Sequence, residues 1–143
     1  MKSTARNQFP CTVEGVESGP VTAQATLALP GGGQITATMT AAAAQRLGLK
    51  AGQPAIALVK ASAVVLVTDF EGYRLSARNQ LAGTISRVDR GPVSALVALA
   101  LPGGASVTAS VTNDAVEQLG LAPGRPATAV FKAYAVMVAV KEA

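Results

Sequence analysis

A chain of 143 residues with a net charge of +4 and no histidine lacks the side chain that most often serves in acid–base catalysis and metal ligation. Hydrophobic residues make up 50% of the chain and charged residues only 14%, so we expect apolar surface to be hidden between repeats and between subunits. The basic residues are scattered, which suits a small anion better than a long polyanion.

The first residues, the apolar runs and the single cysteine indicate where the protein works and which sites it lacks. Met1 to Arg6 contains no apolar core of a signal peptide, and the longest uncharged apolar runs, such as residues 61–67, are too short to span a bilayer. We therefore expect a cytoplasmic protein with no membrane partner. Cys11 is the only cysteine, so an intrachain disulfide or a thiol metal site is excluded, and a small buried residue is the expected role.

The chain is a tandem duplication. Thr4-Ala5-Arg6-Asn7-Gln8 returns as Ser76-Ala77-Arg78-Asn79-Gln80 at an offset of 72 residues, and the Gly-Pro-Val, Leu-Pro-Gly-Gly and Leu-Gly-Leu segments match at the same offset without a gap. About half of the aligned positions are identical, which marks a repeat. We expect one domain over residues 1–69 and a second over residues 70–143, joined by a short, partly packed linker.

The predicted elements of repeat one are five strands and one helix. Segments rich in Val, Thr, Ile and Leu, separated by turn residues, predict strands at 8–16, 21–29, 34–39, 55–60 and 63–68. Ala41 to Leu47 is a run of helix formers that follows Thr40 as N-cap and ends at Gly48. This is the order of an OB-like barrel.

Repeat two follows the same plan, with Thr112 as the cap, a helix over 113–119 and Gly120 as the stop. The sequence therefore predicts an all-β protein of two tandem OB-like five-stranded barrels, each with one short helix.

The residues argue against catalysis. The chain has no pair of thiols, its serines have no histidine as a base, and the one acidic pair that recurs, Glu17 and Asp89, stands beside a turn. We expect no catalytic residues, no cofactor and no metal ion coordinated directly by side chains.

Hydrogen-bond donors recur instead. A hydroxyl and an arginine open each repeat, a threonine caps each helix, and a lysine interrupts a late apolar strand before a small alanine. Helix N-terminal N–H groups, a hydroxyl and a cation together suit a small dianion. Each residue also has a purely structural alternative: the threonine as a cap, the lysine at a strand edge and the arginine paired with a carboxylate.

These motifs together resemble the Mop domain of molybdate-binding proteins, and two in tandem resemble the di-Mop molbindins. The resemblance implies an OB-like fold, a homotrimer that mimics a hexamer of single domains, and oxyanions bound at interfaces between domains. Transferred by position, the main binding residues are Thr4, Arg6, Thr40, Ala43, Lys60 and Ala61 in repeat one, and Ser76, Arg78, Thr112, Ala115, Lys132 and Ala133 in repeat two.

The resemblance also implies a second class of site near the trimer axis, for which Thr22 and Ser94 in the Gly-Pro-Val turns are the candidates. This chain departs from the family pattern at three positions. Thr4 stands where serine is usual, and Ala43 and Ala115 stand where a serine can contribute.

The resulting hypothesis is reversible binding of molybdate, with tungstate as an alternative ligand, for intracellular molybdenum storage or homeostasis. Two rival hypotheses are a nucleic-acid-binding protein and an oligomeric scaffold or regulatory module. OB barrels bind single strands on aromatic platforms, and this chain has two Tyr, three Phe and no Trp, so we expect no nucleic-acid partner.

Overall fold

The computed structural model describes residues 1–142 and contains the same order of elements twice. Repeat one holds β1 (Asn7–Ser18), β2 (Thr22–Ala28), β3 (Gln34–Thr40), α1 (Ala41–Leu47), β4 (Pro54–Val59), the 3₁₀ turn η1 (Ala61–Ala63) and β5 (Val65–Val67). Repeat two holds β6 (Asn79–Arg90), β7 (Ser94–Ala100), β8 (Ser106–Thr112), α2 (Asn113–Leu119), β9 (Pro126–Phe131), η2 (Ala133–Ala135) and β10 (Met137–Ala139).

Local sequence accounts for these elements. In β2 the burial alternates along the strand, with Ala23, Ala25 and Leu27 buried, as expected for a sheet with one face against the core. Both helices begin and end where predicted, because Thr40 and Thr112 cap them and Gly48 and Gly120 take the left-handed conformation that ends them. The expectation of two five-stranded units, each with one short helix, is confirmed.

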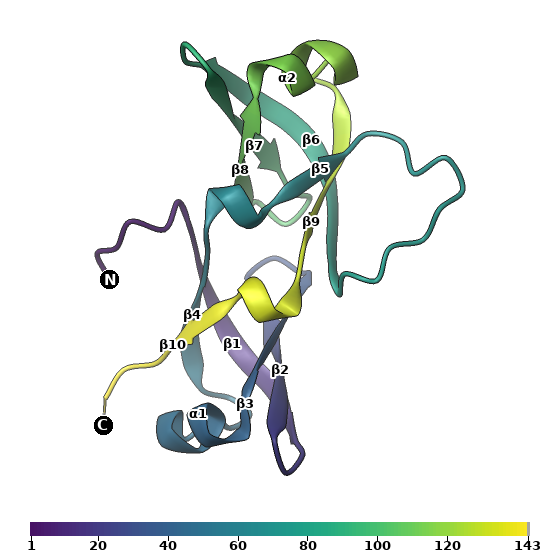
Figure 1. Cartoon of the computed structure of the whole chain (residues 1–143). Coiled ribbons are helices and arrows are strands. Elements are labelled where there is room, and N and C mark those ends of the chain that lie inside the picture. The colour runs from purple at the N-terminus through teal and green to yellow at the C-terminus, as the bar shows by residue number, and fades with distance from the viewer. Residues whose placement is uncertain (143) are drawn as a thin grey trace.

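The two repeats exchange their last strands. One sheet has the order β10-β4-β1-β2-β3 and the other β5-β9-β6-β7-β8, so each sheet takes one edge strand from the other repeat. In Figure 1 the C-terminal strand β10 lies beside β4 in the half that holds α1, and β5 lies beside β9 in the half that holds α2. The predicted domain boundary between residues 1–69 and 70–143 stays a prediction. Each hydrogen-bonded sheet contains strands from both sides of that boundary.

The exchange places the 3₁₀ turns η1 and η2 midway between the ends that carry α1 and α2, in a region that we call the waist (Figure 1). Each turn carries the chain from one half to the other, with η1 packed against β8 and η2 against β3. The two halves also share one continuous apolar core that includes Val13, Leu27, Ile85, Leu99 and Phe131. Neither half is therefore a separate globule.

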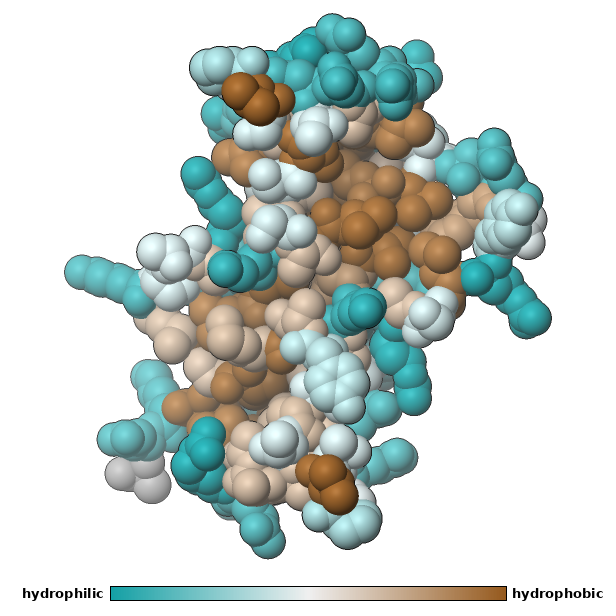
Figure 2. Space-filling model, viewed as in Figure 1, coloured by the Kyte–Doolittle hydropathy of each residue, from teal (hydrophilic) through white to brown (hydrophobic). Residues whose placement is uncertain are grey.

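The surface retains exposed apolar side chains, as the composition suggested. Val65, Leu75, Tyr134 and Met137 are each more than 40% exposed. Figure 2 shows brown, apolar surface over the half that carries β5 and β9. None of the helices in residues 1–142 has the length and apolar character needed to cross a membrane.

Candidate functional site

The opening motif and the late lysine of each repeat meet at the waist. Antiparallel pairing sets Asn7 opposite Val59, so Arg6, one residue before, and Lys60, one residue after, emerge from the same end of the β1–β4 ladder. In repeat two, Asn79 lies opposite Phe131, so Arg78 and Lys132 emerge from the same end of the β6–β9 ladder. The sheet register thus places two cations together in each repeat.

Arg6, Lys60, Arg78 and Lys132 are all exposed. The ion pairs within residues 1–142 join Arg87 to Asp89 and Arg90 to Glu117, so neither Lys60 nor Lys132 has a carboxylate partner there. Arg6 and Arg78 likewise form no ion pair with a carboxylate of the described residues, so the structural alternative proposed for them is not seen there. The small alanines that follow the lysines, Ala61 and Ala133, are buried at the start of the 3₁₀ turns.

In repeat two the structure brings Ser76 and Lys132 into one hollow of about 450 Å³. Its walls are mostly apolar and come from both repeats, because β5 of repeat one lies against β9 of repeat two. The lining residues are Ala63, Val65, Leu75, Ser76, Ala77, Val130, Phe131, Lys132 and Ala135. A hydroxyl and an ammonium on an apolar hollow can bind an anion strongly, provided that another surface covers the hollow and excludes water.

The helix-cap residues lie elsewhere. Thr40 Oγ1 accepts a hydrogen bond from the Ala43 N–H at 3.1 Å, and Thr112 Oγ1 accepts one from the Ala115 N–H at 3.1 Å. Figure 1 shows α1 and α2 at opposite ends of the molecule, away from the 3₁₀ turns at the waist. Within one chain, the cap residues and the lysines of the same repeat do not form one site.

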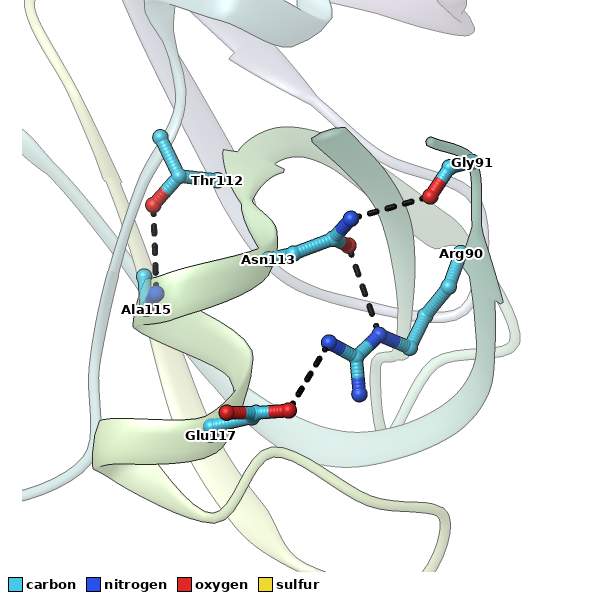
Figure 3. A network of polar contacts seen from close by, with 6 residues as sticks. All are labelled: Arg90, Gly91, Thr112, Asn113, Ala115 and Glu117. Atoms are coloured by element: carbon cyan, nitrogen blue, oxygen red, sulfur yellow. Dashed lines mark hydrogen bonds and ion pairs between the residues drawn. The ribbon is translucent and has the colours of Figure 1, made fainter. Parts of the chain in front are cut away.

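A polar network fixes the start of α2 to the β6–β7 turn (Figure 3). Asn113 Nδ2 donates to the Gly91 carbonyl oxygen at 2.9 Å, and Arg90 donates to Asn113 Oδ1 at 3.3 Å and to Glu117 Oε1 at 3.2 Å. Repeat one carries Ser18, Ala41 and Gln45 at the three equivalent side-chain positions, which cannot form this network. The cap regions of the two repeats therefore differ.

The helices also differ in charge. The first turn of α2 contains Asp114, whereas the first turn of α1 contains no acidic residue and its last turn contains Arg46. An anion near the start of α2 would meet a carboxylate that is absent from α1.

The second-class candidates lie on the turns at the two ends. Thr22 lines a hollow of about 360 Å³ together with Glu17, Ser18, Gly19, Ala23, Gln24 and Thr38. Ser94 holds the equivalent position in repeat two, where its carbonyl oxygen accepts from the Gly91 N–H at 2.8 Å. The carboxylate of Glu17 in the hollow opposes anion binding at Thr22 in a single chain.

Sequence reasoning assigned no role to Gln8 and Gln80, which follow the arginine and asparagine of each opening motif. In the structure both side chains donate hydrogen bonds back to the segment that carries Thr4 or Ser76. Their recurrence at the same offset was the available signal. No group of three or more His, Cys, Asp or Glu side chains that could hold a metal ion occurs in the described part of the chain.

Comparisons with known proteins agree with the repeat. The model of the TOBE domain family matches residues 3–66 and again residues 75–138. The chain is 62% identical over 142 residues to the molybdenum transport protein ModE of Herbaspirillum seropedicae, covering 99% of this chain and 53% of that protein. It is 41% identical over 140 residues to the molybdenum-pterin-binding protein MopA of Rhodobacter capsulatus, covering 98% and 53%. The chain thus spans about half the length of these curated relatives.

A solved structure matches over its full length. The cytoplasmic molybdate-binding protein ModG, crystallised with molybdate bound, superposes with a TM-score of 0.95 at 47% identity. The match covers 99% of this chain and 100% of that one. This chain and ModG therefore share the same fold over their full lengths.

Proposed function

The chain belongs to the TOBE-domain family, with two such domains in tandem. We propose that it binds molybdate reversibly to store or buffer molybdenum in the cytoplasm. The observation that carries the proposal is the full-length match to ModG in its molybdate-bound form. The waist site adds chemical support, because Ser76 and Lys132 lie on one hollow.

The binding residues we propose form two groups in each repeat. The waist group comprises Thr4, Arg6, Lys60 and Ala61 in repeat one and Ser76, Arg78, Lys132 and Ala133 in repeat two. The cap group comprises Thr40, Ala43, Thr112 and Ala115. Since the two groups lie apart in one chain, we assign each complete site to an interface at which the cap group of one copy meets the waist group of another.

This arrangement requires an oligomer, and we propose a homotrimer. Tetrahedral dianions lose hydration when they enter an apolar-walled interface, and hydroxyls, backbone N–H groups and lysine offset that loss. A ligand held between copies stabilises the assembly by mass action. Thr22 and Ser94 are the proposed donors of a second class of site, and tungstate, which is also a tetrahedral dianion, is a proposed alternative ligand.

The mechanism involves binding and release only. We propose no covalent step, no bound cofactor and no nucleic-acid partner. An oligonucleotide added as a competitor tests the nucleic-acid hypothesis directly, because binding at the waist cations would displace molybdate.

The test is equilibrium dialysis of the purified chain against molybdate, with sulfate as competitor and the oligomer mass measured in the same buffer. We expect saturable binding by a trimer that sulfate does not displace. Lys132→Ala should weaken binding about tenfold to a hundredfold at its sites, the cost of a charge-assisted hydrogen bond. Lys50→Ala, which removes an exposed lysine from the loop after α1, is the matched control and should bind like the wild type. Equal affinity in both variants would remove Lys132 from the site, and no binding by the wild type would overturn the function.

A further inference from the structure

The side chain of Gln80 ties together the two residues that flank Ser76. Its Nε2 donates to the Leu75 carbonyl oxygen at 3.3 Å and to the Ala77 carbonyl oxygen at 3.0 Å. Gln80 lies on β6, where its backbone pairs with Val130 of β9, one of the residues that line the hollow. One amide group thus connects a fixed strand to the irregular segment that presents the Ser76 hydroxyl.

Repeat one reaches the same arrangement with a different acceptor. Gln8 Nε2 donates to the Ala5 carbonyl oxygen at 3.3 Å and to Ser3 Oγ at 2.9 Å, so its two acceptors flank Thr4. Ser3 stands where repeat two has Leu75, and its hydroxyl also accepts from the Ala5 N–H at 3.2 Å. The acceptor changed between repeats while the bridge across the hydroxyl residue was kept, which argues that the bridge itself matters.

The bridge has two consequences for an anion. It restricts the backbone on both sides of the hydroxyl residue, so less conformational entropy is lost when a ligand is bound. It also engages the carbonyl oxygens of Leu75 and Ala77, whose partial negative charge would otherwise be free to turn toward an anion at Ser76. A glutamine is suited to both tasks because its NH₂ group donates two hydrogen bonds without adding charge.

We propose that Gln8 and Gln80 are positioning residues for the oxyanion sites, each presenting the neighbouring hydroxyl, of Thr4 or Ser76, through hydrogen bonds to the two flanking residues. This inference rests on the proposed function. It assigns neither glutamine to direct contact with the ligand.

The experiment compares molybdate binding by equilibrium dialysis in variants of Gln80. Gln80→Met keeps the approximate length of the side chain and removes both donors, and we expect about threefold to tenfold weaker binding, the effect of losing one to two hydrogen bonds. Only the sites that use Ser76 should weaken, so the isotherm should separate into two classes. Gln8→Met with Gln80→Met should weaken both classes. The exposed Gln118→Met on α2 is the control for the change of residue type.

A second pair of variants separates positioning from added charge and from a folding defect. Gln80→Lys restores donors and should recover affinity, whereas Gln80→Met combined with Ala82→Lys supplies the same charge on the same face of β6 without the donors and should not. Thermal unfolding without molybdate should differ little between the wild type and Gln80→Met, because the two hydrogen bonds that are lost lie at the exposed surface.

The outcomes are distinct. Wild-type binding with unchanged affinity in Gln80→Met would overturn the positioning role and leave the proposed function intact. Uniform weakening of all sites, or a large loss of thermal stability, would also overturn it, because both indicate a general structural defect. Absence of wild-type binding would overturn the proposed function and this inference together.

Discussion

The side chain of Asn7 pairs with the backbone of Thr108 as a neighbouring strand would. Asn7 Nδ2 donates to the Thr108 carbonyl oxygen and Asn7 Oδ1 accepts from the Thr108 N–H, both at 2.8 Å. Asn79 makes the same pair with Thr36 at 2.9 and 2.8 Å. Each asparagine starts a long strand of one repeat and binds the third strand of the other. The halves are therefore joined by side chains as well as by exchanged strands.

These asparagines should contribute strongly to stability. Both are 2% exposed, so Asn79→Ala would leave the N–H and carbonyl oxygen of Thr36 without partners in a part-buried position. We expect the free energy of unfolding in urea to fall by about 2–4 kcal/mol. Asn113→Ala, which removes hydrogen bonds to Gly91 and Arg90 at the surface, is the control and should cost about 1 kcal/mol or less. Similar decreases in the free energy of unfolding in the two variants would show that the buried hydrogen bonds stabilise the fold no more than those at the surface.

A close approach of two turns at the waist predicts a second sensitive position. A Cβ atom on Gly31 would lie 2.3 Å from the Gly103 carbonyl oxygen, and Gly31 has a φ of 81°. Gly32 has a φ of 106°, but a Cβ atom added there would meet no other atom, so an alanine at position 32 would be strained in its backbone without a clash. Gly31→Ala should therefore lower the unfolding free energy by about 1–3 kcal/mol more than Gly32→Ala. Equal destabilisation of the two variants in urea would mean that the turns separate at little cost.

Sequence predicted the elements well because their causes are local. The alternation of β2, the Thr40 cap and the Gly48 stop each act within a few residues, and the helix bounds were exact. The exchange had no such signal. Val65 pairs with Val130 of the other repeat, and because of the 72-residue offset the pairing within its own repeat would set it against Leu58, a residue of the same kind. The side-chain pattern therefore does not distinguish the exchanged pairing from the pairing within one repeat.

The geometry of the candidate site could be predicted from the sequence only in part, for a related reason. Arg6 and Lys60 meet because of strand register, which follows from the predicted strands, whereas the separation of Thr40 from Lys60 depends on tertiary arrangement. The role of Gln80 was missed because it rests on contacts with backbone oxygens, which no side-chain pattern reports. Residue types thus indicated the chemistry, and the fold determined which groups can act together in one chain.

The charge difference between the helices predicts unequal cap groups. Asp114 lies in the first turn of α2, between Thr112 and Ala115 of the proposed cap group. Asp114→Asn should tighten molybdate binding at the sites that use Thr112 by about twofold to tenfold, because a negative charge is removed near the dianion. The helix should lose about 1 kcal/mol or less. Asp69→Asn in the exposed linker is the control for the change in net charge. Equal tightening in both variants would indicate a long-range effect, and no tightening would place the anion away from α2.

The buried thiol of Cys11 predicts a loss of stability at high pH. Burial raises the pKa of the Cys11 thiol above its ordinary value, against a smaller opposing effect of a backbone hydrogen bond at Ala57. The folded chain therefore keeps the thiol proton at a pH where the unfolded chain has lost it, so the contribution of this group is complete below the unfolded pKa and declines as the pH rises toward the folded value. Cys11→Ala removes the titration, and the stability difference between wild type and variant in urea should be smaller at about pH 10 than at about pH 7. A difference that does not change with pH would show that the thiol ionises as readily in the folded chain as in the unfolded one, despite its buried position on β1.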